Sequence, residues 1–263
     1  MKSVVDEGAR RWTDSGIESG DLVMIHSSGK RTLSELRNDH KECAPRNIIE
    51  SMLLAVGPNG TLLFPLFNFD FTKGVQFDIR NTPSHMGILT ETARVYPGAV
   101  RTGHPIYSFA AIGHTAHLFR DVDNFSGYGI DSPFGMLREL DGKIAVLDLD
   151  DQNSMTFYHH IEEMNEVPYR FHKQFEGDYT DVHGKTDRRT YGLFVRRLDL
   201  GIITKVNPMG DLLWENGIYH GFRPGIGPGL RWAKARQVFD FVTDHIRNGK
   251  AKGLIYDSEK DLR

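Results

Sequence analysis

The stretch KIAVLDLDDQNSMTFYHHIEE, Lys143–Glu163, decides the fold and carries the main candidate site. Its first part, Lys143–Leu149, is a short run rich in Ile, Val and Leu, and such a run predicts a buried strand. The following segment, Asn153–Glu163, predicts a helix, which places His159 and Glu162 on one face because they are three residues apart. A carboxylate beside a neutral imidazole fixes its tautomer and stabilises the imidazolium, so the pair can accept a proton near pH 7.

The pair could also lack any catalytic role, because any helix of such composition contains some polar pair at this spacing. Two further alternatives are left open by helix geometry alone. His160 could face a cleft in place of His159, and Glu163 could replace Glu162 if the helix is rotated. The sequence therefore predicts a proton-accepting helix without deciding which of these side chains faces the substrate.

Outward from this stretch, strands alternate with helices. Leu22–Ile25 and Thr61–Phe67 are further strand-like runs, and Pro45–Val56 has an apolar stripe at helical spacing. Helices are also expected near residues 86–96, after Ser132-Pro133, and over Arg231–Arg247. This alternation predicts an α/β fold. We expect one domain over residues 1–263, with a small β-rich lobe at about residues 167–207.

Composition excludes several classes of protein. The chain of 263 residues is 39% hydrophobic and 25% charged, with a net charge of −3, which is ordinary for a globular protein and offers no basic footprint for nucleic acid. The amino-terminal segment has no apolar core of a signal peptide, and no run approaches the length of a membrane span. A single cysteine, Cys43, excludes an internal disulfide framework and fits a reducing compartment, so a cytoplasmic location is expected.

Three loops are candidates for ligand contacts. His26-Ser27-Ser28 follows a strand end, where backbone N–H groups could polarise a carbonyl, although a simple polar turn would look the same. His104 and Ser108 precede a small apolar run, as in either a ligand loop or a packed strand. Asp131–Gly135 has the composition of a helix start, which could seat a phosphate, although most helix starts bind nothing.

Other chemistries lack their motifs. Gly225–Gly229 does not have the spacing of a dinucleotide fingerprint, and no phosphate-binding P-loop motif is present. A GxSxG nucleophile elbow is absent, and Cys43 lies among charges without a neighbouring histidine. The residues around His159-His160 have neither order of the zinc-binding His–Glu motifs, so no metal is expected.

Taken together, six segments of the chain resemble the aminoglycoside 3-N-acetyltransferase family, the antibiotic N-acetyltransferases that differ in fold from the GNAT acetyltransferases. In order these segments are MIHSS, GTLLFPLF, RNTPSHMG, HPIYSFAAIG, SPFGMLRELDGKIAVLDL and SMTFYHHIEE. The last is the most specific, because the family has Thr, then His three residues on, then an acidic residue three further. Here these are Thr156, His159 and Glu162. The resemblance implies a central mixed β-sheet flanked by helices and an acyl-CoA-dependent N-acyltransferase (EC 2.3.1).

The resemblance also implies roles for particular residues. His159 becomes the general base and Glu162 its orienting partner. Coenzyme A phosphates are expected at the helix start, with Arg101 or Lys143 as cationic partners. The full expected set comprises, for acyl-CoA, His26, Ser27, Ser28, Ser108, Ser132 and Pro133, and, for the acceptor, His104, Asn153, Thr156 and Glu163. The acceptor is a primary amine on a sugar, no metal is involved, and a homodimer is expected by analogy only.

The expected acceptor rests on a departure from the family near the C-terminal end. Resistance members usually have a Gly–Asn–Ala–Glu-like stretch there, whereas this chain has GIGPGLRWAKARQ with Arg231, Lys234 and Arg236. A basic stretch suits an anionic acceptor, so we expect a dTDP- or UDP-linked amino sugar of surface-polysaccharide biosynthesis. The alternatives are an aminoglycoside, as in antibiotic resistance, a metal-dependent amidohydrolase, and a sugar- or nucleotide-binding module without catalysis.

Overall fold

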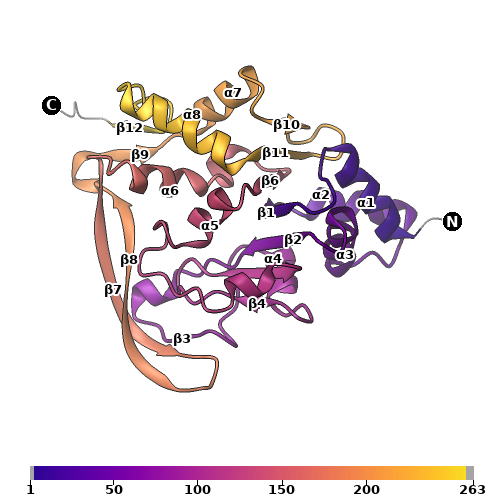
Figure 1. Cartoon of the computed structure of the whole chain (residues 1–263), viewed down its shortest axis with the longest axis horizontal. Coiled ribbons are helices and arrows are strands. Elements are labelled where there is room, and N and C mark those ends of the chain that lie inside the picture. The colour runs from indigo at the N-terminus through magenta and orange to yellow at the C-terminus, as the bar shows by residue number, and fades with distance from the viewer. Residues whose placement is uncertain (1–2, 259–263) are drawn as a thin grey trace.

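The computed structural model describes residues 3–258 and has a seven-stranded mixed sheet at its centre (Figure 1). The strand order is β10-β11-β6-β1-β2-β5-β4. β1 (Leu22–Ser27) pairs in parallel with β2 (Thr61–Pro65) and β6 (Lys143–Leu147). The antiparallel strands outside these three are β4 (Val100–Arg101), β5 (Phe109–Gly113), β10 (His220–Gly221) and β11 (Leu230–Lys234). This arrangement confirms the predicted α/β class.

Both faces of the sheet are buried, which explains the almost continuous apolar runs of its central strands. Val23 and Ile25 of β1 pack with the helices of one face, and Met24 between them packs with the other. The first face is covered by α1 (Val4–Asp14), α3 (Pro45–Val56) and α4 (Ile88–Arg94); the second by α5 (Pro133–Glu139), α6 (Phe157–Met164) and α8 (Ala235–Arg247). The remaining helices are α2 (Lys30–Asp39) and α7 (Asn207–Glu215).

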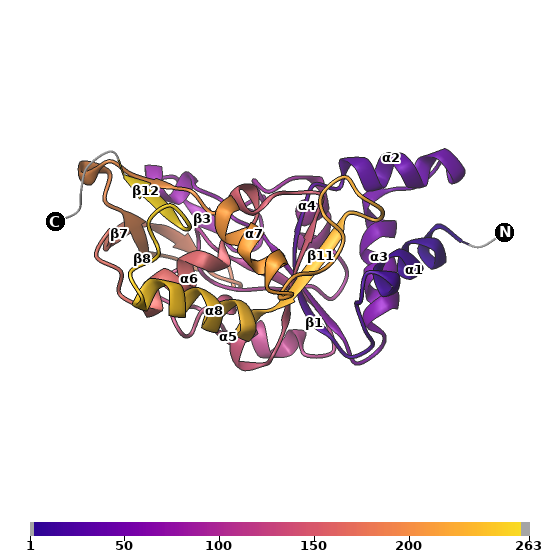
Figure 2. The ribbon, with the colours of Figure 1, turned by 90° about the horizontal axis from the view of Figure 1, so that it is seen from above.

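A long hairpin projects from this body. β7 (Arg170–Thr180) and β8 (Thr186–Arg196) pair antiparallel over their whole length, and β3 (Phe77–Asp78) adds to β7. Figure 2 shows α1–α3 at one end of the molecule and the hairpin at the other. Tyr179 and Tyr191 of the hairpin are buried against Phe77 and Phe71, which holds it to the body. A separate pair consists of β9 (Ile202–Thr204) and β12 (Tyr256–Ser258).

Short 3-10 turns connect several elements. They are η1 (Asp70–Lys73), η2 (Ala116–Phe119), η3 (Asp151–Asn153) and η4 (Leu198–Leu200). Within residues 3–258, no helix has both the length and the apolar character needed to cross a membrane.

Two predicted boundaries were wrong in ways that matter for the site. β1 continues through His26 and Ser27, so these residues belong to a strand and not to a turn. The segment expected to be helical from Arg231 instead forms β11 up to Lys234, and α8 starts only at Ala235. β11 pairs with the outer side of β6, so backbone pairing at an open sheet edge overrides the helical pattern.

Candidate active site

A cavity of about 470 Å³ opens beside α6, between the body and the base of the hairpin. Only His159 among the predicted site residues lines it. The lining residues are Tyr107, Tyr128, His159, Arg170, Phe171, Lys173, Phe175, Leu193, Phe194, Val195, Arg196, Leu198, Asp199 and Thr204. Most of them come from β7 and β8, so the hairpin forms much of the wall around the histidine.

The start of α6 decides which histidine reaches this cavity. The chain leaves β6 at Leu147 and enters α6 at Phe157. The His159 side chain is 21% exposed, whereas His160 is fully buried between Phe157 and Phe239. His160 Nδ1 lies 2.7 Å from the carbonyl oxygen of Tyr128. The structure therefore places His159 against the cavity and His160 in the core.

Glu162 and Arg170 hold the His159 ring at its Nδ1 side. His159 Nδ1 lies 3.0 Å from Glu162 Oε2 and 2.9 Å from Arg170 Nη2. Arg170 Nε lies 2.7 Å from the same Glu162 oxygen, and its Nη1 donates to the carbonyl of Phe194 at 2.9 Å. In the tautomer with Nδ1 protonated, this nitrogen donates to Glu162, Arg170 Nη2 lies against it without donating to it, and the lone pair is on Nε2.

The charges around His159 favour its neutral form. Burial lowers the pKa of His159 and the positive charge of Arg170 lowers it further, and these effects outweigh the hydrogen bond that His159 donates to Glu162, which raises it. Burial would raise the pKa of Glu162, but Arg170 and His159 outweigh burial and hold it below its ordinary value. At neutral pH the group is therefore an uncharged imidazole beside a carboxylate and a guanidinium.

Aromatic rings form the inner wall. The Tyr128 ring meets the His159 ring edge-on with centroids 5.2 Å apart, and Tyr107 packs edge-on against Tyr128 at 4.7 Å. The outer part of the cavity is charged, with Lys173 and Arg196 alongside Arg170 and only Asp199 as a lining carboxylate. The cavity thus combines an aromatic inner wall with a cationic rim.

His104 and Ser108, which were expected to line the cleft, lie inside the fold and not at the cavity surface. Both are fully buried. His104 Nδ1 accepts from the backbone N–H groups of Ile106 and Tyr107, at 3.2 and 3.0 Å. Burial lowers the pKa of His104 to about 4, so the ring is neutral and shapes this turn. The Ser108 hydroxyl accepts from Arg101 Nε at 3.2 Å.

The His26–Ser28 segment lies at the end of β1 and does not line the cavity. The Ser28 N–H donates to the carbonyl of Leu147 at 2.8 Å, continuing the ladder with β6, so it is not free to bind an oxyanion. Burial, together with the charge of Arg231, lowers the pKa of His26 to about 4. His26 Nε2 and Ser27 Oγ are buried and lack a hydrogen-bond partner within residues 3–258, and any contact with acyl-CoA stays a prediction.

The predicted phosphate seat is a well-formed but closed helix start. Ser132 caps α5 and Pro133 occupies the first helical position, as expected. Both residues are buried, and the Ser132 hydroxyl donates to the carbonyl of Gly129 at 2.6 Å and accepts from the Gly135 N–H. The Ser132 hydroxyl and the Gly135 N–H are therefore already engaged in bonds of the helix start itself.

Lys143 and Arg101, the two cations expected near the coenzyme A phosphates, lie in different surroundings. Lys143 is buried, and its ammonium lies 2.6 Å from Asp21 Oδ2, so it forms an internal ion pair and cannot meet a phosphate. Arg101 lies at the edge of the sheet and lines a different cavity from that of His159.

The remaining predicted acceptor residues also lie outside the cavity. Asn153 is exposed and donates to Asp150 Oδ1 at 2.7 Å, which supports η3. Thr156 is the residue before α6, and its side chain makes no capping bond. Glu163 accepts from the Ser126 hydroxyl at 2.7 Å and is largely buried, so Glu162, and not Glu163, pairs with His159.

The basic stretch near the C-terminal end, which suggested an anionic acceptor, is engaged elsewhere. Arg231 is buried, with its Nη2 2.7 Å from Asp151 Oδ1. Lys234 pairs with Asp141 at 3.0 Å. Arg236 Nη2 donates to backbone carbonyls at the end of α5. None of the three lines the cavity of His159, so the argument for an anionic acceptor from this stretch was wrong.

Sequence reasoning missed Arg170, Tyr128 and Arg196. None of them lies within a recognised motif, and Arg170 reaches Glu162 only because β7 begins beside α6. For the two arginines the one available signal was the charge-rich character of residues 167–207, which does not indicate a partner.

The fold and this site define an α/β protein with a histidine–carboxylate pair at a cavity beside the base of a β-hairpin. The model of the aminoglycoside 3-N-acetyltransferase family matches residues 24–247, so the chain belongs to that family. This confirms the resemblance drawn from the sequence segments.

Individual relatives agree with the family assignment. Aminoglycoside N(3)-acetyltransferase IV from Salmonella sp. is 30% identical over 157 residues, which cover 59% of this chain and 56% of that relative. The chain thus spans little more than half the length of this curated relative. The crystal structure of aminoglycoside acetyltransferase AAC(3)-Xa is 25% identical, with a TM-score of 0.77 over 93% of this chain and 92% of that one. AAC-IIIb in a binary complex with CoASH is 22% identical, with a TM-score of 0.78 over 94% and 97%.

Proposed function

We propose that this protein is an acyl-CoA-dependent N-acetyltransferase that acylates a primary amine of an aminoglycoside. The observation that carries the proposal is the His159–Glu162–Arg170 arrangement at the base of the cavity. The names of the relatives support both the reaction and the acceptor, and a structural neighbour that holds CoASH supports the donor. The relatives therefore favour an aminoglycoside over the nucleotide-linked sugar that the basic stretch suggested.

The protonation state of the acceptor amine determines why the reaction needs a base. A sugar ammonium has no lone pair, so it must lose a proton before its nitrogen can attack the thioester carbonyl. Neutral His159 takes that proton at Nε2, while Glu162 on Nδ1 stabilises the imidazolium. The new C–N bond forms as the C–S bond breaks. The nitrogen loses two protons in all, of which one passes through His159 to the leaving thiolate and the other is released to solvent. The thioester is already activated, so no acyl-enzyme is required.

We also propose that residues 1–263 act as one acyltransferase domain. The base comes from α6 in the body, whereas much of the cavity wall comes from β7 and β8. A hairpin that moved independently would open the site to water and separate Arg170 from Glu162.

The metal-dependent amidohydrolase has less support. Within residues 3–258, no three His, Cys, Asp or Glu side chains gather as ligands for a metal ion. The Nδ1 of the histidine in the cavity lies against the Glu162–Arg170 ion pair. This donor set suits proton transfer more than metal binding.

A thiol-release assay tests the proposal directly. Purified protein is mixed with acetyl-CoA and, in separate reactions, a set of aminoglycosides and a set of dTDP- and UDP-linked amino sugars. We expect thiol release with aminoglycosides and mass-spectrometric detection of an acetylated amine. Release only with nucleotide-linked amines would contradict the acceptor, and no release with either set would contradict the reaction.

The His159→Ala variant tests the assigned base. Loss of a general base costs about 10²–10⁴-fold in rate, so we expect kcat to fall at least a hundredfold while the thermal unfolding transition is kept. His183→Ala is the matched control, because His183 lies exposed at the hairpin turn outside the cavity. Equal rates in both variants would remove His159 from the mechanism.

A further inference from the structure

A second cavity, of about 410 Å³, lies at the β4 edge of the sheet and shares no lining residue with the cavity of His159. Four arginines from different segments converge on it: Arg80, Arg94, Arg101 and Arg120. The rest of the lining is Ile79, Gly98, Ala99, Val100 and Val182, which adds no carboxylate and no aromatic ring. A hollow surrounded by guanidinium groups is a place where an anion binds favourably.

Arg101 lies at the inner end of this cavity and has no ion-pair partner within residues 3–258. Its Nη1 donates to the carbonyls of Ile79 and Thr82, at 3.2 and 2.5 Å. Its guanidinium stacks on the Phe77 ring, 4.8 Å from the centroid. Its Nη2 is buried and has no hydrogen-bond partner in the described part of the chain. Neutral acceptors thus fix the side chain, and the carboxylates of Glu91 and Asp78 act on its charge only from a distance, without forming an ion pair.

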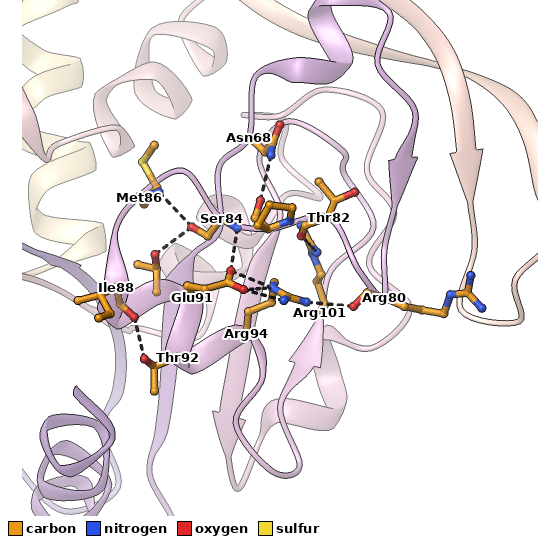
Figure 3. Close-up of polar contacts among 12 residues, drawn as sticks. Asn68, Arg80, Thr82, Ser84, Met86, Ile88, Glu91, Thr92, Arg94 and Arg101 are labelled. Atoms are coloured by element: carbon orange, nitrogen blue, oxygen red, sulfur yellow. Dashed lines mark hydrogen bonds and ion pairs between the residues drawn. The ribbon is translucent and has the colours of Figure 1, made fainter. Parts of the chain in front are cut away.

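The other three arginines differ in how far they are neutralised. Arg94 forms a bidentate pair with Glu91 and also donates to the carbonyl of Arg80 (Figure 3). Arg80 pairs with Asp78 at 2.9 Å, and Asp181 acts on it at longer range. Arg120 is exposed and has no ion pair among the described residues. Four guanidinium groups against the two paired carboxylates leave 4 − 2 = 2 positive charges.

We propose that this arginine cavity is a binding site for a phosphate ester, whose dianionic phosphoryl group meets Arg101 and Arg120. Two positive charges match a phosphoryl dianion, and the Nη2 of Arg101 and the guanidinium fork of Arg120 can donate to its oxygens. The volume exceeds that of a phosphate ion, so an organic part can remain inside. The lack of aromatic rings argues against a stacked base as the main anchor.

A phosphate ester here could come from two sources, namely the ribose 3′-phosphate of coenzyme A or a separate phosphorylated metabolite. Only the first rests on the proposed function. Isothermal titration of the intact protein with inorganic phosphate, coenzyme A and dephospho-coenzyme A distinguishes the two, because the last compound lacks only the 3′-phosphate.

Two variants locate the binding. Arg120→Gln removes an exposed charge that makes no ion pair in the described chain, and Arg101→Lys keeps the charge but removes the fork. Arg10→Gln is the matched control, because Arg10 is an exposed arginine on α1 outside this cavity. Each lost charge-assisted contact is expected to weaken binding about tenfold. Arg120→Gln decides the question even if Arg101→Lys unfolds.

The expected result is that wild-type protein binds inorganic phosphate saturably, and that Arg120→Gln weakens this binding while Arg10→Gln does not. If coenzyme A is the source, wild type prefers it to dephospho-coenzyme A and Arg120→Gln abolishes the preference. If the source is separate, phosphate still binds to protein saturated with coenzyme A. The proposal is overturned if phosphate does not bind below about 10 mM, or if Arg120→Gln behaves like the control. If phosphate binding fails while the thiol-release assay succeeds, only the arginine-cavity proposal is overturned and the proposed function is unaffected.

Discussion

Arg170 Nε lies 2.7 Å from Glu162 Oε2, and both side chains are buried. This ion pair joins the first residue of β7 to α6, so it connects the hairpin to the helix that carries the proposed base. The guanidinium also lies 2.9 Å from His159 Nδ1. Arg170 therefore both positions the pair and lowers the proton affinity of the histidine.

Arg170→Gln is expected to change the pH dependence of catalysis. Burial, and then Arg170, lower the pKa of His159, so removal of this cation raises it. The rate depends on neutral His159, and the acid limb of kcat/KM should move to higher pH. The plateau rate should also fall, by about tenfold to a hundredfold, through loss of positioning. Arg188→Gln, farther along β8, is the control; an unchanged acid limb in Arg170→Gln would contradict the electrostatic role.

The cationic rim of the cavity predicts a weak affinity for polycationic acceptors. Lys173 is exposed at this rim and contacts only the Phe175 ring in the described structure, so Lys173→Glu changes the local charge by two without breaking an ion pair. We expect KM for an aminoglycoside to fall about threefold at low salt, with little change in kcat. The effect should vanish at high salt. Lys185→Glu in the hairpin turn lies outside the cavity, and an equal fall in KM there would indicate a general charge effect.

Three buried histidines predict a loss of stability in acid. Burial is the largest cause that lowers the pKa values of His26, His104 and His160 to about 4. Their unfolded pKa is near 6.5, so the unfolded chain binds more protons below that pH. Stability is complete above about pH 6.5 and falls as the pH drops toward 4, by about 2 kcal/mol for each histidine at pH 5.

Chemical denaturation between pH 7.5 and pH 4.5 measures this dependence. His160→Phe removes one of these protonation sites and should reduce the slope of unfolding free energy against pH, while His159, whose pKa is also lowered by burial, contributes to the slope in both proteins. The comparison of slopes separates the proton effect from the lost bond to Tyr128, which shifts stability equally at all pH values. A flat profile in wild-type protein would contradict the prediction.

A buried charge network before α6 should be sensitive to single changes. Asp151 pairs with Arg231 at 2.7 Å and accepts from the hydroxyls of Tyr158 and Tyr219, both at 2.8 Å. Asp151→Asn leaves the buried guanidinium without its counter-charge, which costs about 3 kcal/mol. Tyr219→Phe removes one hydrogen bond and costs about 1 kcal/mol. Urea unfolding of both variants checks the order, and equal losses would mean that the charge is not the dominant contribution.

Local pattern was enough to predict the layers of this fold. Apolar runs such as Lys143–Leu147 and the stripe of Pro45–Val56 are buried where expected, because strand and helix periodicity decide which side chains share a face. The same reasoning failed at Arg231–Lys234. There the segment forms a strand because it pairs with the open edge of β6, and a strand that depends on a partner remote in sequence is not visible in local pattern.

The sequence by itself determined the α/β class, the family and the pairing of His159 with Glu162, because spacing along one helix fixes which side chains are neighbours. The tertiary structure alone decided that His159 and not His160 faces a cavity, that Arg170 completes the pair, and that the Ser28 N–H is already bonded. It also decided that Arg231 and Lys143 are buried in internal ion pairs. The physical reason is that the partners of a charged or polar group determine whether it can bind a ligand or exchange a proton. These partners depend on strand pairing and packing between segments far apart in the chain.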